Sequence, residues 1–213
     1  MKPLHYLSIL LSVLCLPLAQ AAEEKATPAG PVTIFNGKDL TGWKDAKDNK
    51  FWKVVDGILV GENDEKLKGN MLYTEKAYYN VAVECEVRFS GDIDSGIMLR
   101  RSADGKHDIQ MQIGVSRSLK KDMTCSIYCS PLKVKYPEAG QAKRLAELWK
   151  KDDWNRVRFQ ANGDKYSVWL NGEKVVNDYT DPFYTKPESI GLQIHPGVKM
   201  KVEYRNIKVE ELN

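Results

Sequence analysis

Hydrophobic and polar residues alternate along many short stretches of the chain, and a period of two is typical of β-strands with one buried face. The clearest run places Val81, Val83, Cys85, Val87 and Phe89 on one face. Further runs of this kind are found at 97–100, 108–113 and 190–195. Turn-forming Gly, Asn and Asp separate the runs, so the pattern predicts an all-β fold, a sandwich of two antiparallel sheets.

Local turn and helix signals add detail to this prediction. Asn162-Gly163-Asp164 and Asn171-Gly172 each separate two β-rich runs, and both predict tight hairpin turns. Residues 141–150 form a stretch with helical spacing of apolar residues, including Leu145 and Trp149. We expect one short helix there, covering an edge or rim of the sandwich.

The polar positions of these strands form a second, complementary set. Opposite the apolar residues lie Glu84, Glu86, Arg88, Met98, Arg100, Asp108, Gln110, Gln112, Gln193 and His195. If the four strands are neighbours in one sheet, these side chains meet in a groove. Amides and guanidinium groups match vicinal hydroxyls, so the set favours a sugar-like ligand. A solvated face with cross-strand ion pairs, such as Glu86 with Arg100, is equally compatible with the alternation.

The amino terminus has the features of a secretory signal peptide. Lys2 precedes an apolar run from Leu7 to Leu18 that is too short to span a bilayer, and Ala19-Gln20-Ala21 provides a small-residue cleavage site. A lipoprotein signal through Cys15 is the weaker alternative, because bulky Leu14 precedes it. We therefore expect a signal peptide over 1–21, a flexible leader over 22–31 and one domain over 32–213, in a periplasmic or secreted protein.

Charge and hydropathy limit the classes of partner. The formal net charge is +3, and cleavage after Ala21 removes one positive charge with Lys2. Acidic and basic residues are interspersed without a basic stripe, which argues against nucleic acid as a partner. No second long apolar segment follows the first, so we expect no integral membrane segment after cleavage.

Three cysteines follow the predicted signal peptide, at Cys85, Cys125 and Cys129. Cys85 occupies an apolar position of its strand, so we interpret it as a small buried hydrophobic residue. Cys125 and Cys129 are able to form a disulfide only if the chain turns between them, since residues four apart on a straight strand are separated by about 13 Å. The spacing does not resemble a zinc site.

Five stretches, taken together and in order, resemble the 3-keto-disaccharide hydrolase domain family over roughly 32–212. They are "IFNGKDLTGW" from Ile34, "FWKVVDGILVG", "VECEVRFSGDIDSGIMLRR", "WNRVRFQANGDKYSVWLNGEKVV" and "IGLQIHPGVKMKVEYRNIKVEEL". The resemblance implies a concanavalin-like jelly roll whose concave sheet carries the site, and cleavage of glycosides whose sugar has been oxidised to the 3-keto form.

The family motifs match the polar positions that the alternation already singles out. The matches are Glu86, Ser95-Gly96-Ile97, Arg100, Asp108-Ile109-Gln110 and Gln193-Ile194-His195. Asp94 and Asp108 depart from the commoner Asn and Glu of relatives, and Cys125 stands where relatives often have Gly. These departures bear on which sugar is the substrate.

The implied reaction removes the acidic proton on C2 of the 3-keto sugar, eliminates the glycosidic oxygen from C1 and then adds water. We assign His195 as the base, Glu86 or Asp108 as the acid/base, and Arg100 as the group that holds the oxyanion. A divalent metal ion held by His195 and Glu86 is a candidate cofactor, and no nucleotide cofactor is expected. The residues expected to bind the glycoside are Gln110, Gln112, Gln193, Glu84, Arg88 and Trp43.

Two other functions compete with this hypothesis. A non-catalytic carbohydrate-binding domain needs exposed aromatic rings, for which Trp43, Trp52, Trp169 and Tyr128 are candidates, although we expect Trp52 in the core. A conventional glycoside hydrolase needs two carboxyl groups on either side of the glycosidic bond. Jelly-roll glucanases often present such carboxyl groups as Glu-x-Asp-x-x-Glu, which the chain lacks, so this function ranks third.

Overall fold

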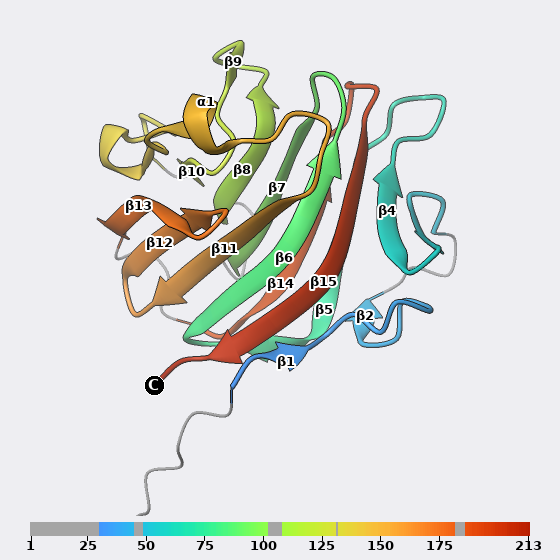
Figure 1. Cartoon of the computed structure of the whole chain (residues 1–213), viewed down its shortest axis with the longest axis horizontal. Helices are drawn as coiled ribbons and strands as arrows, with labels where there is room; N and C mark the ends of the chain where they lie inside the picture. The colour runs from blue at the N-terminus through green and yellow to red at the C-terminus, as the bar shows by residue number, and fades with distance from the viewer. Residues whose placement is uncertain (1–29, 45–48, 102–107, 131, 182–185) are drawn as a thin grey trace, which may run out of the picture.

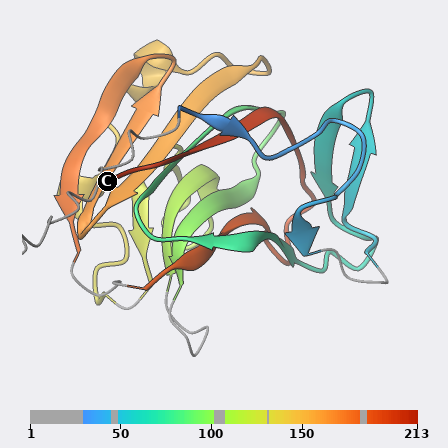
Figure 2. The same cartoon turned by 90° about the horizontal axis from the view of Figure 1, so that it is seen from below.

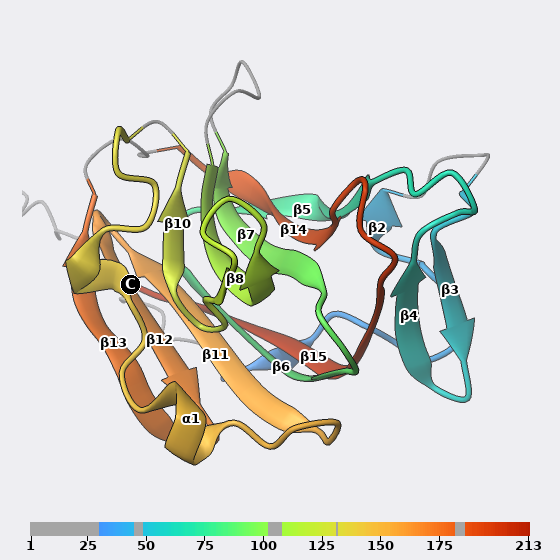
Figure 3. The same ribbon diagram turned by 90° about the horizontal axis from the view of Figure 1, so that it is seen from above.

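Two antiparallel sheets packed face to face form the body of the protein (Figure 1). The computed structural model describes residues 30–44, 49–101, 108–130, 132–181 and 186–213. The predicted signal peptide and most of the predicted leader lie outside these residues. The prediction of an all-β antiparallel sandwich is confirmed, and Figure 3 shows the two sheets as separate layers.

The first sheet is called sheet A. Within the described residues it is one continuous row of strands, and a further short strand pairs with one strand of this row. In spatial order the row is β13 (Glu173–Thr180), β12 (Lys165–Leu170), β11 (Asn155–Asn162), β6 (Val81–Phe89), β15 (Lys201–Glu211), β4 (Ile58–Glu62) and β3 (Trp52–Val55), and β1 (Val32–Thr33) pairs with β15. Figure 2 shows the β3–β4 hairpin at one side of the molecule.

The second sheet, called sheet B, lies across the core from sheet A. Its described strands are, in spatial order, β10 (Ile127–Cys129), β8 (Asp108–Ser116), β7 (Asp94–Arg101), β14 (Glu188–Ile194), β5 (Asn70–Tyr78) and β2 (Trp43–Lys44), with β9 (Lys121–Asp122) paired to β8. β8, β7 and β14 are adjacent, so the polar faces of these three predicted strands meet.

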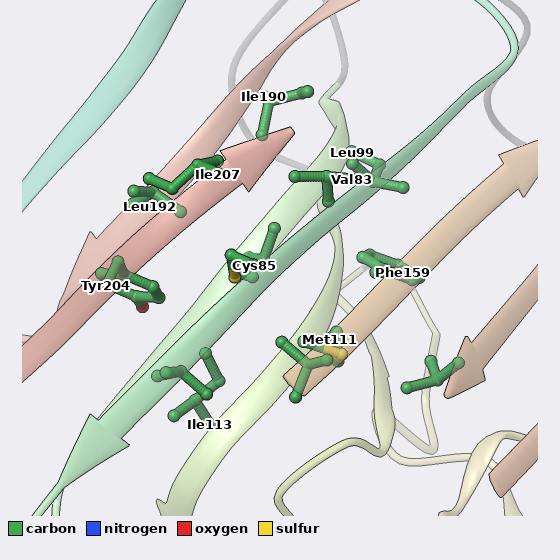
Figure 4. Packing of buried hydrophobic residues seen from close by; sticks show 14 of the residues in the cluster. Val83, Cys85, Leu99, Met111, Ile113, Phe159, Ile190, Leu192, Tyr204 and Ile207 are labelled. Atoms are coloured by element: carbon green, nitrogen blue, oxygen red, sulfur yellow. The ribbon is translucent and has the colours of Figure 1, made fainter. Parts of the chain in front are cut away.

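Apolar positions of both sheets point toward one another and form the core. Figure 4 shows this packing, with Val83 and Cys85 from β6 on one side and Met111 and Leu192 from sheet B on the other. These side chains are at most 2% exposed. The apolar parity that the sequence predicts is therefore the inward parity in both sheets.

The predicted hairpins form, whereas the helix is shorter than predicted. β11 and β12 are joined at Gly163, and β12 and β13 at Asn171 and Gly172, which both have positive φ as a tight turn requires. The helix α1 covers only Leu145–Leu148, after a 3₁₀ turn at Glu138–Gly140. The residue before it, Arg144, has a left-handed conformation that cannot continue a helix backwards.

The three cysteines within the described residues lie in the core. Cys85, Cys125 and Cys129 are free thiols buried in the core, so the predicted burial of Cys85 is confirmed. Burial raises the pKa of Cys129 to about 12.

Within the described ranges, the chain forms no helix with the length and apolar character needed to cross a bilayer.

Candidate functional site

A cavity of about 370 Å³ opens on the outer face of sheet B. Gln110 and Gln112 of β8 line it, whereas their neighbours Ile109 and Met111 point into the core. Across the sheet, Gln110 lies opposite Met98 of β7 in register. The alternation of a strand therefore delivers amide side chains to the cavity and apolar side chains to the core from the same segment.

A hydrogen-bonded network of buried polar side chains forms the floor of this cavity. Gln112 is its centre: its Oε1 accepts from Gln110 Nε2 (2.8 Å) and from the Tyr136 hydroxyl (2.9 Å), and its Nε2 donates to Asp94 Oδ1 (2.9 Å). The other oxygen of Asp94 accepts from the backbone N–H of Arg117 at 3.3 Å. Burial raises the pKa of Tyr136 to about 12, so its hydroxyl remains a donor at neutral pH.

A glycine creates the space in which this network lies. A Cβ on Gly96 would be 2.8 Å from Gln110 Nε2 and 3.0 Å from the carbonyl oxygen of Met111. Gly96 lies opposite Gln112 in register, and its missing side chain leaves room for the Gln110 amide to reach Gln112 on the outer face. This gives a physical reason for the glycine in the Ser95-Gly96-Ile97 motif.

The imidazole of His195 lies at the end of β14, at the wall of the cavity. Its Nδ1 is 2.7 Å from the carbonyl oxygen of Pro196, and its own backbone carbonyl accepts from Asn63 Nδ2 at 3.1 Å. A carbonyl oxygen only accepts, so Nδ1 must carry the proton. In the neutral ring Nε2 is then unprotonated, which makes His195 a potential base.

The remaining wall provides one unsatisfied acceptor, two cations and an aromatic pair. Gln193 Oε1 is buried and has no hydrogen-bond partner among the described residues. Arg117 and Lys135 are exposed at the rim, and none of the ion pairs found within the described residues includes them. Tyr128 packs against Tyr136 with ring centroids 5.1 Å apart. Such a set provides donors, an acceptor and a ring face, as a polyhydroxylated ligand requires.

Glu84, Glu86 and Arg88 do not belong to this site, although the sequence predicts that they do. They lie on β6 in sheet A, because the chain crosses from one sheet to the other between β6 and β7 instead of forming a hairpin. On the outer face of sheet A they form cross-strand ion pairs, including Arg156–Glu84 (2.8 Å) and Arg88–Glu203 (2.7 Å). The expectation that all four polar strands share one groove is therefore wrong for this strand.

Glu86 is also chemically unsuited to the assigned role. It is bound by Arg205 Nε at 2.9 Å and not by Arg100. The hydrogen bond from Arg205 lowers the pKa of Glu86, and one from Asn206 acts in the same direction. His195 and Glu86 project from the outer faces of different sheets, so they cannot share a metal ion. In the parts of the chain that the structure describes, no cluster of three His, Cys, Asp or Glu side chains is placed to hold one.

Arg100 points into the protein because a bulge inverts its parity. The register of β7 against β8 shifts so that Met98 lies opposite Gln110 but Arg100 lies opposite the inward-facing Ile109. Arg100 is 0% exposed, and its guanidinium donates to the backbone carbonyl of Lys186 at 3.2 Å. Arg100 does not line the cavity, so the prediction that it holds an oxyanion there is not supported by its position.

Asp108 and Trp43 also lie away from the cavity wall. Asp108 begins β8 on the parity of Gln110, and its backbone N–H donates to Ser130 Oγ at 2.7 Å. It does not line the cavity. Trp43 is 3% exposed and donates from Nε1 to the carbonyl of Ile34, so it is a core residue and offers no face for stacking.

Six residues of the cavity had no predicted role, namely Asp94, Ser116, Arg117, Ser118, Lys135 and Tyr136. Asp94 shares the outward parity of its strand, and this was the available signal for it. Ser116 and Arg117 lie where β8 ends, and Tyr136 lies in the irregular segment after β10. No periodicity marks such segments. The loop containing Tyr136 is folded back by a hydrogen bond from the Cys129 N–H to the carbonyl of Lys135.

Comparison with known proteins agrees with a carbohydrate-related site. Residues 30–210 match the model of the 3-keto-α-glucoside-1,2-lyase-like domain. No curated protein matches the chain in sequence.

Solved structures are similar in fold at low sequence identity. Two proteins of Parabacteroides distasonis ATCC 8503, both provisionally named glycosyl hydrolases, are 22% and 21% identical, with TM-scores of 0.63 and 0.64. Each alignment covers 86% of this chain, and 94% and 100% of the other. The β-glucanase of Bacillus licheniformis has a TM-score of 0.57 at 13% identity, over 89% of this chain and all of that one. The predicted concanavalin-like jelly roll is thus confirmed.

Proposed function

Because the chain belongs to the 3-keto-α-glucoside-1,2-lyase-like domain family, we propose that it is an enzyme that cleaves 3-keto-glycosides in the cavity of sheet B. The observation that carries this proposal is the hydrogen bond between His195 Nδ1 and the Pro196 carbonyl. It leaves Nε2 as a basic nitrogen in a cavity otherwise lined by amides, hydroxyls, cations and the Asp94 carboxylate. We further propose that residues 1–21 direct the protein to the periplasm or the exterior.

The reaction proceeds by elimination and rehydration. A ketone on C3 acidifies the hydrogen on C2, and His195 Nε2 takes that proton while the electron pair forms an enolate on the C3 oxygen. The enolate then expels the glycosidic oxygen from C1, and the departing oxygen takes up the proton that His195 Nε2 had accepted, which regenerates the base. Water adds across the resulting C1–C2 double bond, its oxygen to C1 and its proton to C2. The net change is hydrolysis of the glycoside.

The other cavity residues bind the sugar and stabilise negative charge. Gln193 Oε1 accepts a hydrogen bond from a sugar hydroxyl, which satisfies its buried acceptor. The cation of Lys135 stabilises the enolate oxygen, the role that the sequence had suggested for Arg100. Tyr128 offers a half-buried ring face for the sugar. No step requires Glu86 or Asp108.

Turnover of a chromogenic 3-keto-glucoside tests the proposal, with and without added divalent metal. The wild type should release the aglycone, and His195→Gln should lower kcat by roughly 10²- to 10⁴-fold while retaining sugar binding. Deuterium at C2 of the substrate should slow the wild-type reaction, since the C2–H bond breaks before the aglycone leaves. Glu86→Gln is the matched control, because it removes a charged side chain that lies on the other sheet.

The same experiment separates the alternatives. Sugar binding without turnover, under every metal condition, would favour a carbohydrate-binding domain, for which the Tyr128–Tyr136 ring pair provides an aromatic surface. Turnover of ordinary glycosides without a C2 isotope effect would favour a conventional glycoside hydrolase. That mechanism needs two carboxyl groups, and Asp94 is the carboxylate that the described cavity wall contains.

A further inference from the structure

The carbonyl of Pro196 accepts two hydrogen bonds from different parts of the site. His195 Nδ1 donates at 2.7 Å, and Arg117 Nη1 donates at 3.1 Å. Arg117 is itself anchored through its backbone N–H to Asp94 Oδ2. The end of β8, the start of β7 and the turn after β14 are therefore connected around one peptide group.

The direction of that peptide group depends on Gly197. Gly197 has φ of +73°, and a Pro-Gly pair with positive φ at the glycine is typical of a type II turn. In a type I turn the peptide between these residues is rotated so that its carbonyl points to the opposite side. The carbonyl of Pro196 would then be unable to accept from His195. The orientation of the imidazole consequently depends on which turn the Pro196–Gly197 pair adopts.

Arg117 and Gly197 fit together in a way that favours the observed turn. A Cβ on Gly197 would be 2.7 Å from Arg117 Nη1, so the guanidinium occupies the space that the glycine leaves. The guanidinium also donates to the carbonyl of Pro196 in the orientation that His195 requires. A rotated peptide would lose both hydrogen bonds to the Pro196 carbonyl, together with the one that the Gly197 N–H donates to the carbonyl of Leu67 at 2.7 Å. Arg117 therefore acts together with Leu67, one at each end of the peptide group.

We propose that Arg117 is a positioning residue that holds the Pro196–Gly197 peptide in place and thereby fixes His195 in the Nδ1–H tautomer. This inference deepens the proposed function, because it explains how Nε2 is kept unprotonated and available as the base. It also assigns Arg117 a role that does not depend on contact with the substrate. Two hydrogen bonds to the Pro196 carbonyl and the close approach of Arg117 to Gly197 support this role.

The tautomer can be observed directly by ¹⁵N NMR of the imidazole in the full chain at a pH where the ring is neutral. The signals of His195 are those missing from the spectrum of His195→Gln. In the wild type, Nδ1 should have the shift of a protonated nitrogen and Nε2 that of an unprotonated one. In Arg117→Met and in Gly197→Ala, both shifts should move toward a mixture of tautomers.

Lys135→Met is the matched control, because it removes a cation from the same cavity that does not contact Pro196. It should leave the tautomer as in the wild type. The proposal is overturned if Arg117→Met keeps the wild-type shifts, or if Lys135→Met changes them as much as Arg117→Met does. Circular dichroism verifies that each variant is folded, and Arg117→Gln serves as a second variant if the methionine variant is not.

Activity provides an independent readout where the proposed reaction is observed. Arg117→Met should lower kcat by about 10- to 100-fold, which is the usual effect of removing a group that orients a functional histidine. KM should change less than kcat, since a positioning residue acts on the base. If the protein turns over no 3-keto-glycoside but the tautomer shifts as expected, the proposed function fails and the role of Arg117 stands.

Discussion

Replacing Gln112 by methionine tests whether the buried network supports the site. Methionine has a similar volume, so the change removes hydrogen bonds with little change in packing. Gln112 is 1% exposed and has three hydrogen bonds, to Gln110, Tyr136 and Asp94. The bond to the Asp94 carboxylate contributes about 1.5–3 kcal/mol, and each neutral bond about 1 kcal/mol. Water in the cavity can replace part of this, so we expect a loss of about 3 kcal/mol.

Urea unfolding and thermal unfolding measure this effect. For a chain of this size, a loss of about 3 kcal/mol lowers Tm by roughly 6–12 °C. Gln110→Met is the matched control, because it removes one of the three hydrogen bonds and leaves those to Tyr136 and Asp94 intact. Its expected cost is about 1 kcal/mol. If Gln112→Met is no less stable than Gln110→Met, the network contributes no net stability and the argument that it preorganises the cavity is refuted.

Three further predictions follow from the placement of other residues. Glu86→Gln should keep wild-type turnover and lose less than about 1 kcal/mol at pH 7, since this ion pair is partly exposed. Because pairing lowers the pKa of Glu86, its stabilisation exists above the unfolded pKa of about 4.3 and is lost as the pH falls below that value, so the urea midpoints of the two proteins should converge on acidification. Arg100→Met should lower Tm by several degrees but leave sugar affinity unchanged in calorimetric titrations; weakened affinity at unchanged stability would contradict its position in the core. Cys85, Cys125 and Cys129 should react with a thiol reagent only after denaturation, and reaction of the native protein would show that their burial is incomplete.

Local alternation was sufficient to predict the faces of the strands. Gln110, Gln112, Gln193 and His195 were all assigned to the polar parity, and the structure brings them to one cavity. The reason is that side-chain direction depends on local backbone geometry alone. Three of the strands involved, β7, β8 and β14, then happen to be neighbours in one sheet.

Alternation along a single strand predicts neither which strands pair with one another nor where a bulge reverses the direction of a side chain. Consecutive runs in the sequence suggest pairing, but β6 and β7 belong to different sheets, and the choice of partner depends on contacts distant in sequence. Arg100 is preceded by a regular alternation that gives no sign of the bulge which turns it inward. Arg117 and Tyr136 come from segments without periodicity, where hydrogen bonds between loops decide the position of a side chain.

Cavities on the outer faces of the two sheets differ in the chemistry of their walls. On sheet A, a cavity of about 420 Å³ is lined by charged side chains such as Glu84 and Arg156, which form ion pairs with one another across strands. On sheet B, the strands carry neutral amides, which can be buried at lower cost than charges when they are hydrogen-bonded. Gly96 and Gly191 lie among them without side chains, and a Cβ on Gly191 would be 2.7 Å from the ring of Tyr73. The polar floor of this cavity thus results from amides that bind one another, and Gly96 leaves the space that the Gln110 amide occupies.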